Sequence, residues 1–181
     1  KTPAIVFPDA PLDQMVNGVL TGIFACLGQV CVAASRLLVH KSQHDELLDR
    51  IIAKAKNLRQ GDPMDERNHL GCVAVESHLK TIEKYVDRAK AEKADLVLGG
   101  RRPEGQQYAK GLYYQPTVFD RVTPDMTIAR EEVFGPVLSV ITFNDEDEAV
   151  RIANGSEFGL MANIWTSDGG RALRLARRLR V

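Results

Sequence analysis

The sequence predicts an α/β fold of three layers, in which helices flank both faces of a largely parallel β-sheet. Short apolar runs, typical of buried strands, alternate along the chain with longer amphipathic segments that follow the 3.6-residue period of a helix. Turn-forming glycine, proline and asparagine residues separate most of these segments. Strands that alternate with helices form parallel sheets, because each helix carries the chain back to the edge where the next strand begins.

The predicted strands are short runs of apolar residues bounded by turns. They cover residues 4–7, 37–40, 94–100, 112–119, 137–143 and 162–166. The run at 112–119 contains Pro116, and because proline has no backbone N–H to donate, we expect this strand at an edge of the sheet. The long connection that follows, residues 120–136, is of a length that often carries a functional site.

The predicted helices place apolar side chains on one face. They cover residues 15–24, 42–58, 77–93 and 145–154, with a last helix from 168 onward. Ser42 and Asp45 resemble a capping box for the second of them, and Asp168 can cap the last. In that last helix we expect Leu173 and Leu175 to face the core.

The composition is that of a globular protein. The 181 residues are 44% hydrophobic and include 24 basic and 24 acidic side chains, so the zero net charge argues against nucleic acid or an anionic membrane as the partner. No apolar stretch approaches the roughly 20 residues that span a bilayer, and the start lacks the build of a secretory leader. We therefore expect a cytoplasmic protein in which residues 1–181 form one domain.

Cys31 is the first candidate for chemistry and lies in the stretch ACLGQVCVAASRLLVH, residues 25–40. Gly28 ends the preceding helical pattern, so this thiol lies in a turn, where backbone N–H groups can stabilise a thiolate and a developing oxyanion. The alternative is that Cys31 is a small apolar residue in a core, as buried cysteines usually are. Cys26 lies on the apolar side of a helix and Cys72 has no comparable setting, so we expect both to be structural and all three thiols to be reduced.

The second candidate is AREEVFGPVLSV, residues 129–140. Two glutamates, an aromatic residue and a Gly-Pro turn can place a carboxylate and a ring edge at the lip of a sheet, suited to a ribose hydroxyl pair and a flat heteroaromatic ring. The alternative is that Glu131 and Glu132 are solvated charges and that Phe134 fills the core.

The histidines do not indicate a metal site. They lie at uneven spacings with no paired metal-ligand pattern, so we expect surface or capping roles for His40, His44, His69 and His78. The sequence contains no nucleophile elbow, no P-loop and no G-x-G-x-x-G. The phosphates of any dinucleotide must therefore be held outside these residues.

Together, the two candidate segments resemble the signatures of the NAD(P)-dependent aldehyde dehydrogenase superfamily. FACLGQVCVAAS, residues 24–35, resembles the catalytic-cysteine motif, although Cys26 stands where the family usually has asparagine, and EEVFGP, residues 131–136, resembles the cofactor-contact motif. KTPAIVFPDAPLD, GDPMD, YYQPTVF and FGLMANIWTSD extend the likeness over nearly the whole chain. The resemblance implies that residues 1–181 correspond to the catalytic, cysteine-bearing domain of that family.

The resemblance also implies a role for each candidate residue. Cys31 would be the nucleophile that attacks an aldehyde carbon, giving a thiohemiacetal and, after hydride transfer to NAD or NADP, a thioester that is hydrolysed to a carboxylic acid. Its backbone N–H would form half of the oxyanion hole. Glu132 would hold the hydroxyls of the nicotinamide ribose, and Phe134 would flank the ring. The family's cofactor-contacting glutamine and lysine fall on His78 and Thr81, so that role does not carry over.

Other parts of the family's site would lie outside these residues. The glutamate that acts as general base precedes Lys1 in the family, and the dinucleotide-binding domain, the oxyanion-hole asparagine and the oligomerisation segment lie elsewhere. We therefore expect a homo-oligomer at full length and no dehydrogenase turnover from residues 1–181 alone. Two alternatives are an acylating enzyme, in which coenzyme A takes the acyl group, and a non-catalytic relative with a structural or binding role. These residues specify neither the aldehyde nor the choice between NAD and NADP.

Overall fold

A six-stranded β-sheet runs through the centre of the protein, whose residues 1–181 are all described by a computed structural model. The strands are β1 (Pro3–Val6), β2 (Arg36–His40), β3 (Asp95–Leu98), β4 (Thr117–Asp120), β5 (Val137–Phe143) and β6 (Asn163–Trp165). Their spatial order is β3-β4-β5-β2-β1-β6, and every neighbouring pair is parallel except β3 with β4. The predicted α/β class with a largely parallel sheet is confirmed.

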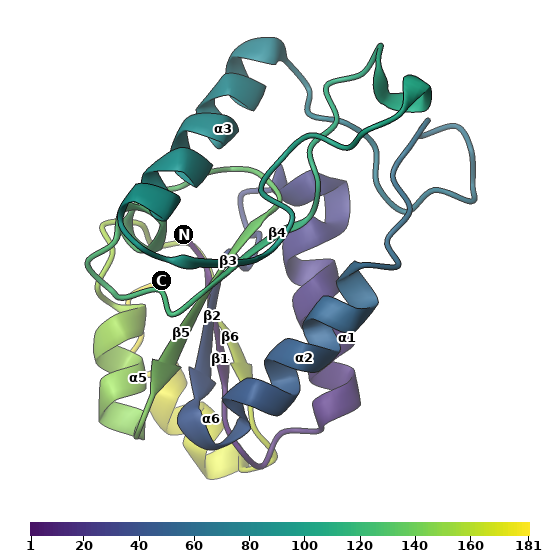
Figure 1. Ribbon diagram of the computed structural model, residues 1–181. Helices are drawn as coiled ribbons and strands as arrows, with labels where there is room; N and C mark the ends of the chain where they lie inside the picture. The colour runs from purple at the N-terminus through teal and green to yellow at the C-terminus, as the bar shows by residue number, and fades with distance from the viewer.

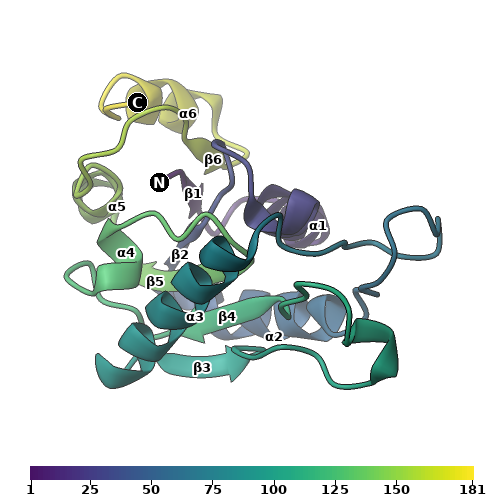
Figure 2. The same cartoon turned by 90° about the horizontal axis from the view of Figure 1, so that it is seen from above.

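Helices cover both faces of this sheet (Figure 1 and Figure 2). They are α1 (Leu12–Phe24), α2 (His44–Ala55), α3 (Glu76–Ala91), α4 (Thr127–Arg130), α5 (Glu146–Ala153) and α6 (Gly169–Ala176), with short 3-10 turns η1 (Ala25–Gly28), η2 (Lys41–Gln43) and η3 (Gln106–Tyr108). Helices α1 and α2 pack together on one face, and α5 and α6 cover the other. None of the helices combines the length and the apolar character that a bilayer crossing needs.

Apolar residues at helical spacing account for helix α1, the element that leads to Cys31. Its buried residues are Met15, Val16, Val19, Leu20, Ile23 and Phe24. They join the strands in one hydrophobic core of 44 buried residues, so burial of this face stabilises the helix. That residues 1–181 form one domain stays a prediction.

The prediction of an edge strand at 112–119 was wrong. Only Thr117–Asp120 forms β4, and this strand is fully buried between β3 and β5. Pro116 precedes the strand, so its missing N–H removes no ladder bond, and the N–H of Thr117 donates to the carbonyl of Pro136 at 2.8 Å. The edge position belongs to β3, whose first three residues are exposed.

The predicted helix ends are partly confirmed. Asp168 accepts a hydrogen bond from the N–H of Arg171 and caps α6 as expected. Ser42 caps nothing: it lies in η2, its N–H donates to the His40 ring at 3.3 Å, and α2 begins only at His44. Leu175 is buried but Leu173 is 64% exposed, because α6 packs beside the edge strand β6, where only a narrow stripe of the helix is covered.

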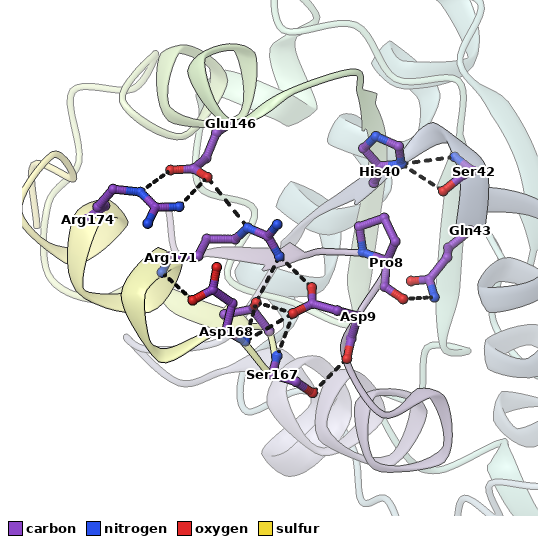
Figure 3. Close-up of polar contacts among 11 residues, drawn as sticks. Pro8, Asp9, His40, Ser42, Gln43, Glu146, Ser167, Asp168, Arg171 and Arg174 are labelled. Atoms are coloured by element: carbon purple, nitrogen blue, oxygen red, sulfur yellow. Dashed lines mark hydrogen bonds and ion pairs between the residues drawn. The ribbon is translucent and has the colours of Figure 1, made fainter.

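A cluster of polar contacts closes the carboxyl edge of the sheet, where β1 and β6 end (Figure 3). The Asp9 carboxylate accepts hydrogen bonds from the Thr166 hydroxyl at 2.7 Å, from the N–H groups of Ser167 and Asp168 at 2.9 and 3.0 Å, and from Arg171 at 2.6 Å. We call this set the Asp9 clasp. Ligands of open α/β sheets usually bind at this edge, but here the segments after β1 and β6 are joined to each other instead.

Candidate active site

Both candidate segments lie at the opposite, amino edge of the sheet. Residues 25–35, the Cys31 turn, lead into β2, and residues 131–136, the Phe134 loop, lead into β5. These two strands are parallel neighbours. Their pairing continues into the approach to β2, where the N–H of Ser139 donates to the carbonyl of Ser35 at 2.9 Å. Segments about a hundred residues apart in sequence are therefore brought side by side by one strand pair.

The missing side chain of Gly28 brings the segments into direct backbone contact at Gly135. Gly28 has a φ of +69°, and a Cβ at this position would lie 2.5 Å from the carbonyl carbon of Gly135. Cys26 and Leu27, which precede Gly28, also have left-handed backbones, with φ values of 50° and 57°. This unusual run turns the chain away from α1 and presses it against the Phe134 loop.

Cys31 lies on the surface of the chain. Its side chain is exposed, so the alternative in which Cys31 is packed in a core is wrong for these residues. The turn that carries it is tied down on its far side, where the N–H of Ala34 donates to the carbonyl of Gly22 at 2.9 Å. The N–H of Cys31 itself donates to no backbone carbonyl and no side chain in the structure, which leaves a donor available beside the thiol.

The structure corrects the expected settings of the other two cysteines. Cys26 follows the end of α1 rather than lying on its apolar face, and both Cys26 and Cys72 are exposed. Gln29 links their backbones, since its side-chain amide donates to the carbonyl of Cys26 at 3.2 Å and to that of Cys72 at 3.4 Å. Exposure alone therefore does not distinguish Cys31 from the other thiols.

The two glutamates have different environments. The hydroxyl of Tyr85 donates to Glu131 at 2.8 Å, and burial together with this bond raises the pKa of Tyr85. Glu132 is one third exposed and lies 3.5 Å from the backbone nitrogen of Lys1. The carboxylate of Glu132 thus lies where the chain enters β1, with free acceptor capacity toward a ligand.

Phe134 does not fill the core. Its side chain is 37% exposed, and its backbone has a φ of 55°, rare for an aromatic residue. His78, at the start of α3, holds this residue: its Nε2 lies 2.6 Å from the Phe134 carbonyl oxygen, and the two rings meet edge to face at 5.9 Å. Of the histidines, His40 has the expected capping role.

Arg36, which the sequence did not indicate as important, is a buried cation at the amino edge of the sheet. Arg36 donates to the carbonyls of Lys1, Ile152 and Ala153 at 3.1, 3.0 and 2.8 Å, and so joins the start of β1 to the end of α5. Burial lowers the pKa of Arg36 to about 10. The only sign of this role in the sequence is that Arg36, a charged residue, directly precedes the apolar run at 37–39.

Lys1 is a second missed residue. Its Nζ atom is buried and has no hydrogen-bond partner. Burial, and then the charge of Arg36, lowers the pKa of the Lys1 amine to about 7, while Glu132 acts in the opposite direction. Because Lys1 adjoins Glu132, this amine contributes to the electrostatic environment of the site.

An apolar hollow of about 530 Å³ adjoins the Cys31 turn. The turn contributes Val30, Val32 and Ala33, and the lining also includes Met161, Asn163 and Trp165. Such a hollow can hold the apolar part of a small molecule, and its lining includes both chain neighbours of Cys31 but not Cys31 itself. No group of three or more His, Cys, Asp or Glu side chains is arranged to hold a metal ion.

A sequence model described as "Aldehyde dehydrogenase family" matches residues 1–181, and the chain belongs to that family. Among curated relatives, the betaine aldehyde dehydrogenase of Brucella anthropi is 41% identical over 180 residues, which cover 99% of this chain and 37% of the relative. The betaine aldehyde dehydrogenase of Rhizobium leguminosarum bv. trifolii is 46% identical over 179 residues, again 99% and 37% of the two chains. The chain thus spans little more than a third of the length of these relatives.

Solved structures share the fold. Betaine aldehyde dehydrogenase from Staphylococcus aureus in complex with NAD+ matches with a TM-score of 0.98 and 38% identity, covering 99% of this chain and 36% of that one. The NAD-dependent aldehyde dehydrogenase from Sinorhizobium meliloti matches with a TM-score of 0.96 and 45% identity, covering 100% and 35%. One structure of the Staphylococcus aureus enzyme carries a cysteine modified by BME.

Proposed function

We propose that residues 1–181 are the catalytic, cysteine-bearing domain of an NAD+-dependent aldehyde dehydrogenase that oxidises an aldehyde to a carboxylic acid. One observation carries this proposal: the exposed Cys31 turn and the Glu132–Phe134 loop are in backbone contact at Gly28 and Gly135. A thiol, a carboxylate and an exposed ring therefore lie on adjoining loops.

In the proposed reaction, the Cys31 thiolate bonds to the aldehyde carbon and forms a thiohemiacetal. The negative charge that develops on the oxygen is stabilised by the N–H of Cys31, which has no other acceptor in the chain. Hydride loss converts the adduct into a thioester on the Cys31 sulfur. Water then attacks the thioester, the carbon–sulfur bond breaks, and the acid leaves with the thiol restored.

The residues of this chain fit the nicotinamide half of the cofactor. Glu132 has acceptor oxygens for a pair of ribose hydroxyls, and the exposed Phe134 ring offers a surface for a flat ring. When bound, NAD+ supplies the hydride acceptor of the oxidation step. The chain contains no glycine-rich phosphate loop, so we assign the diphosphate and adenosine contacts to the rest of the polypeptide.

We propose betaine aldehyde as the first substrate to test, because both relatives described above are named betaine aldehyde dehydrogenase. The apolar hollow beside Cys31 is open to a small aldehyde. We also propose that the intact protein is a cytoplasmic homo-oligomer, as the family resemblance implies. Light scattering of the purified intact protein measures the oligomeric state directly.

The decisive experiment is an aldehyde panel with the intact protein that contains this chain. We expect NADH and the carboxylic acid to form in equal amounts without coenzyme A. Formation of acyl-coenzyme A only when coenzyme A is supplied would favour the acylating alternative. No NADH with any aldehyde, from a folded protein, would favour the non-catalytic alternative.

A further inference from the structure

Helix α3 contacts the Phe134 loop through one face. His78 bonds to the carbonyl of Phe134 at 2.6 Å, and Tyr85 bonds to Glu131 at 2.8 Å. Between them, Ile82 lies against Gly135, where an added Cβ would come within 2.7 Å of its side chain. The spacings of four and three residues place these side chains in one row along the helix.

The loop is therefore held between two supports. The row on α3 contacts it on one side, and the backbone of Gly28 in the Cys31 turn contacts it on the other. Figure 2 shows α3 in front of β4 and β5, close to the end of the sheet from which this loop enters β5. A shift of the loop would require either the α3 row or the Cys31 turn to move.

His78 acts at the most strained point of the loop. Phe134 has a φ of 55°, a conformation that costs about 1–2 kcal/mol for a residue with a side chain. A carbonyl oxygen only accepts, so Nε2 of His78 must carry the proton in this contact. The hydrogen bond and the edge-to-face ring contact together favour the left-handed backbone while leaving the Phe134 ring 37% exposed.

We propose that His78 is a positioning residue of the cofactor site: it holds the Phe134 loop in the conformation that presents the ring to the nicotinamide. This inference rests on the proposed function. It assigns a role to His78, the position at which this chain lacks the family's cofactor-contacting glutamine. His78 acts through Phe134 and need not contact the reacting atoms.

The test compares variants of the intact protein. In His78→Ala the loop loses its hydrogen bond, and we expect the Kd and KM for NAD+ to rise about threefold to tenfold, the range for one such bond, with the KM for the aldehyde changed less than twofold. In His78→Gln the side-chain amide can donate to the same carbonyl, and we expect most of the NAD+ affinity to return. Lys84→Ala, an exposed change on the same helix, serves as the matched control.

A second readout needs neither cofactor nor turnover. Amide hydrogen exchange of residues 131–137 in the cofactor-free protein should be faster in His78→Ala than in the parent, slower again in His78→Gln, and unchanged in Lys84→Ala. Unchanged exchange in a folded His78→Ala protein would overturn the proposal whatever its activity. Faster exchange together with unchanged NAD+ affinity would also overturn it, whereas faster exchange in a protein that binds no NAD+ at all would mean that the proposed function has failed.

Discussion

Gly28 and Gly135 are in backbone contact, and through them the Cys31 turn touches the Phe134 loop. A Cβ at Gly28 would lie 2.5 Å from the carbonyl carbon of Gly135, and the φ of Gly28 is +69°. Neither glycine carries chemistry. The missing side chain of Gly28 allows the proposed nucleophile and the proposed cofactor loop to approach closely, whereas the missing side chain of Gly135 makes room for Ile82 of α3.

We expect Gly28→Ala to destabilise the intact protein by at least about 2 kcal/mol, because the left-handed backbone alone costs about 1–2 kcal/mol and the clash adds to it. Urea unfolding measures the loss, and dehydrogenase activity should fall with it as the two loops separate. Gly169→Ala at the start of α6 is the matched control, since a Cβ there meets nothing within 4 Å. Equal stabilities for the two variants would contradict the close approach.

We expect iodoacetamide to alkylate Cys31 much faster than Cys26 or Cys72 in the intact protein, and NAD+ and aldehyde to protect it. All three thiols are exposed in residues 1–181, so access within this chain does not separate them, and we expect the faster rate at Cys31 to come from activation of its thiolate. Peptide mass spectrometry over a time course measures the three rates. Cys31→Ala should lower kcat by about 1,000-fold or more, whereas Cys72→Ser should retain activity. Equal slow labelling of the three thiols would remove the case for a nucleophile.

We expect Glu132→Gln to lower kcat/KM for NAD+ about tenfold to a hundredfold, because a charge-assisted hydrogen bond to ribose contributes about 1.5–3 kcal/mol. Glu131→Gln is the control on the adjacent residue, where the amide oxygen can still accept the hydrogen bond from Tyr85 and only the charge is lost. Steady-state kinetics with NAD+ varied separates the two variants. A larger effect of Glu131→Gln would reverse the assignment of the ribose contact.

We expect Asp9→Ala to cost about 1–3 kcal/mol of stability through loss of the Asp9 clasp. Burial acts to raise the pKa of Asp9, but the bonds from Thr166 and Ser167 and the charge of Arg171 lower it overall. The folded pKa therefore lies below the ordinary value of 3.8, so the stabilisation is complete above that value and is lost as the pH falls through the folded pKa.

Unfolding free energies of the parent and of Asp9→Asn, measured from neutral pH down to pH values below 3.8, test this pH dependence. The difference in unfolding free energy between the two proteins should be largest near neutral pH and should become smaller in acid. Asp13→Ala is the surface control, since its carboxylate is 83% exposed and pairs only with Arg50, so its effect should stay within about 1 kcal/mol. A difference in unfolding free energy that becomes larger in acid would contradict the lowered pKa of Asp9.

We expect a polypeptide of residues 1–181 alone to form no NADH with any aldehyde. The chain covers 37% of the length of its relatives, and the proposed base and phosphate contacts lie in the remainder. The purified polypeptide, shown to be folded by its unfolding transition, is assayed beside the intact protein. Steady NADH production by residues 1–181 would show that these residues contain a complete site.

Much of the site region was visible in the sequence because its motifs are local. The 3.6-residue pattern of α1, the turn at Gly28 and the pairing of two glutamates with Phe134 all lie within short windows. Cys31 and Phe134 were both chosen as candidates on this basis, and the structure places them on adjoining loops. Their roles in chemistry stay predictions.

The sequence failed where a residue's environment is made by distant segments. Pro116 predicted an edge, but whether a strand lies at an edge depends on which strands flank it, and β3 takes that place. Leu173 fits the helical period yet is exposed, because the sheet ends beside α6. Cys26 was assigned to a helix that had already ended at Phe24.

By itself, the sequence determined the alternation of strands and helices, the thiol in a turn and the carboxylate beside an aromatic residue, because these depend on neighbours along the chain. Only the tertiary structure decided that the two candidate segments meet at the amino edge of the sheet, that Gly28 contacts Gly135, and that His78 bonds to Phe134. These contacts join residues 56 or more positions apart, so they exist only after the β2–β5 pair and α3 have packed together.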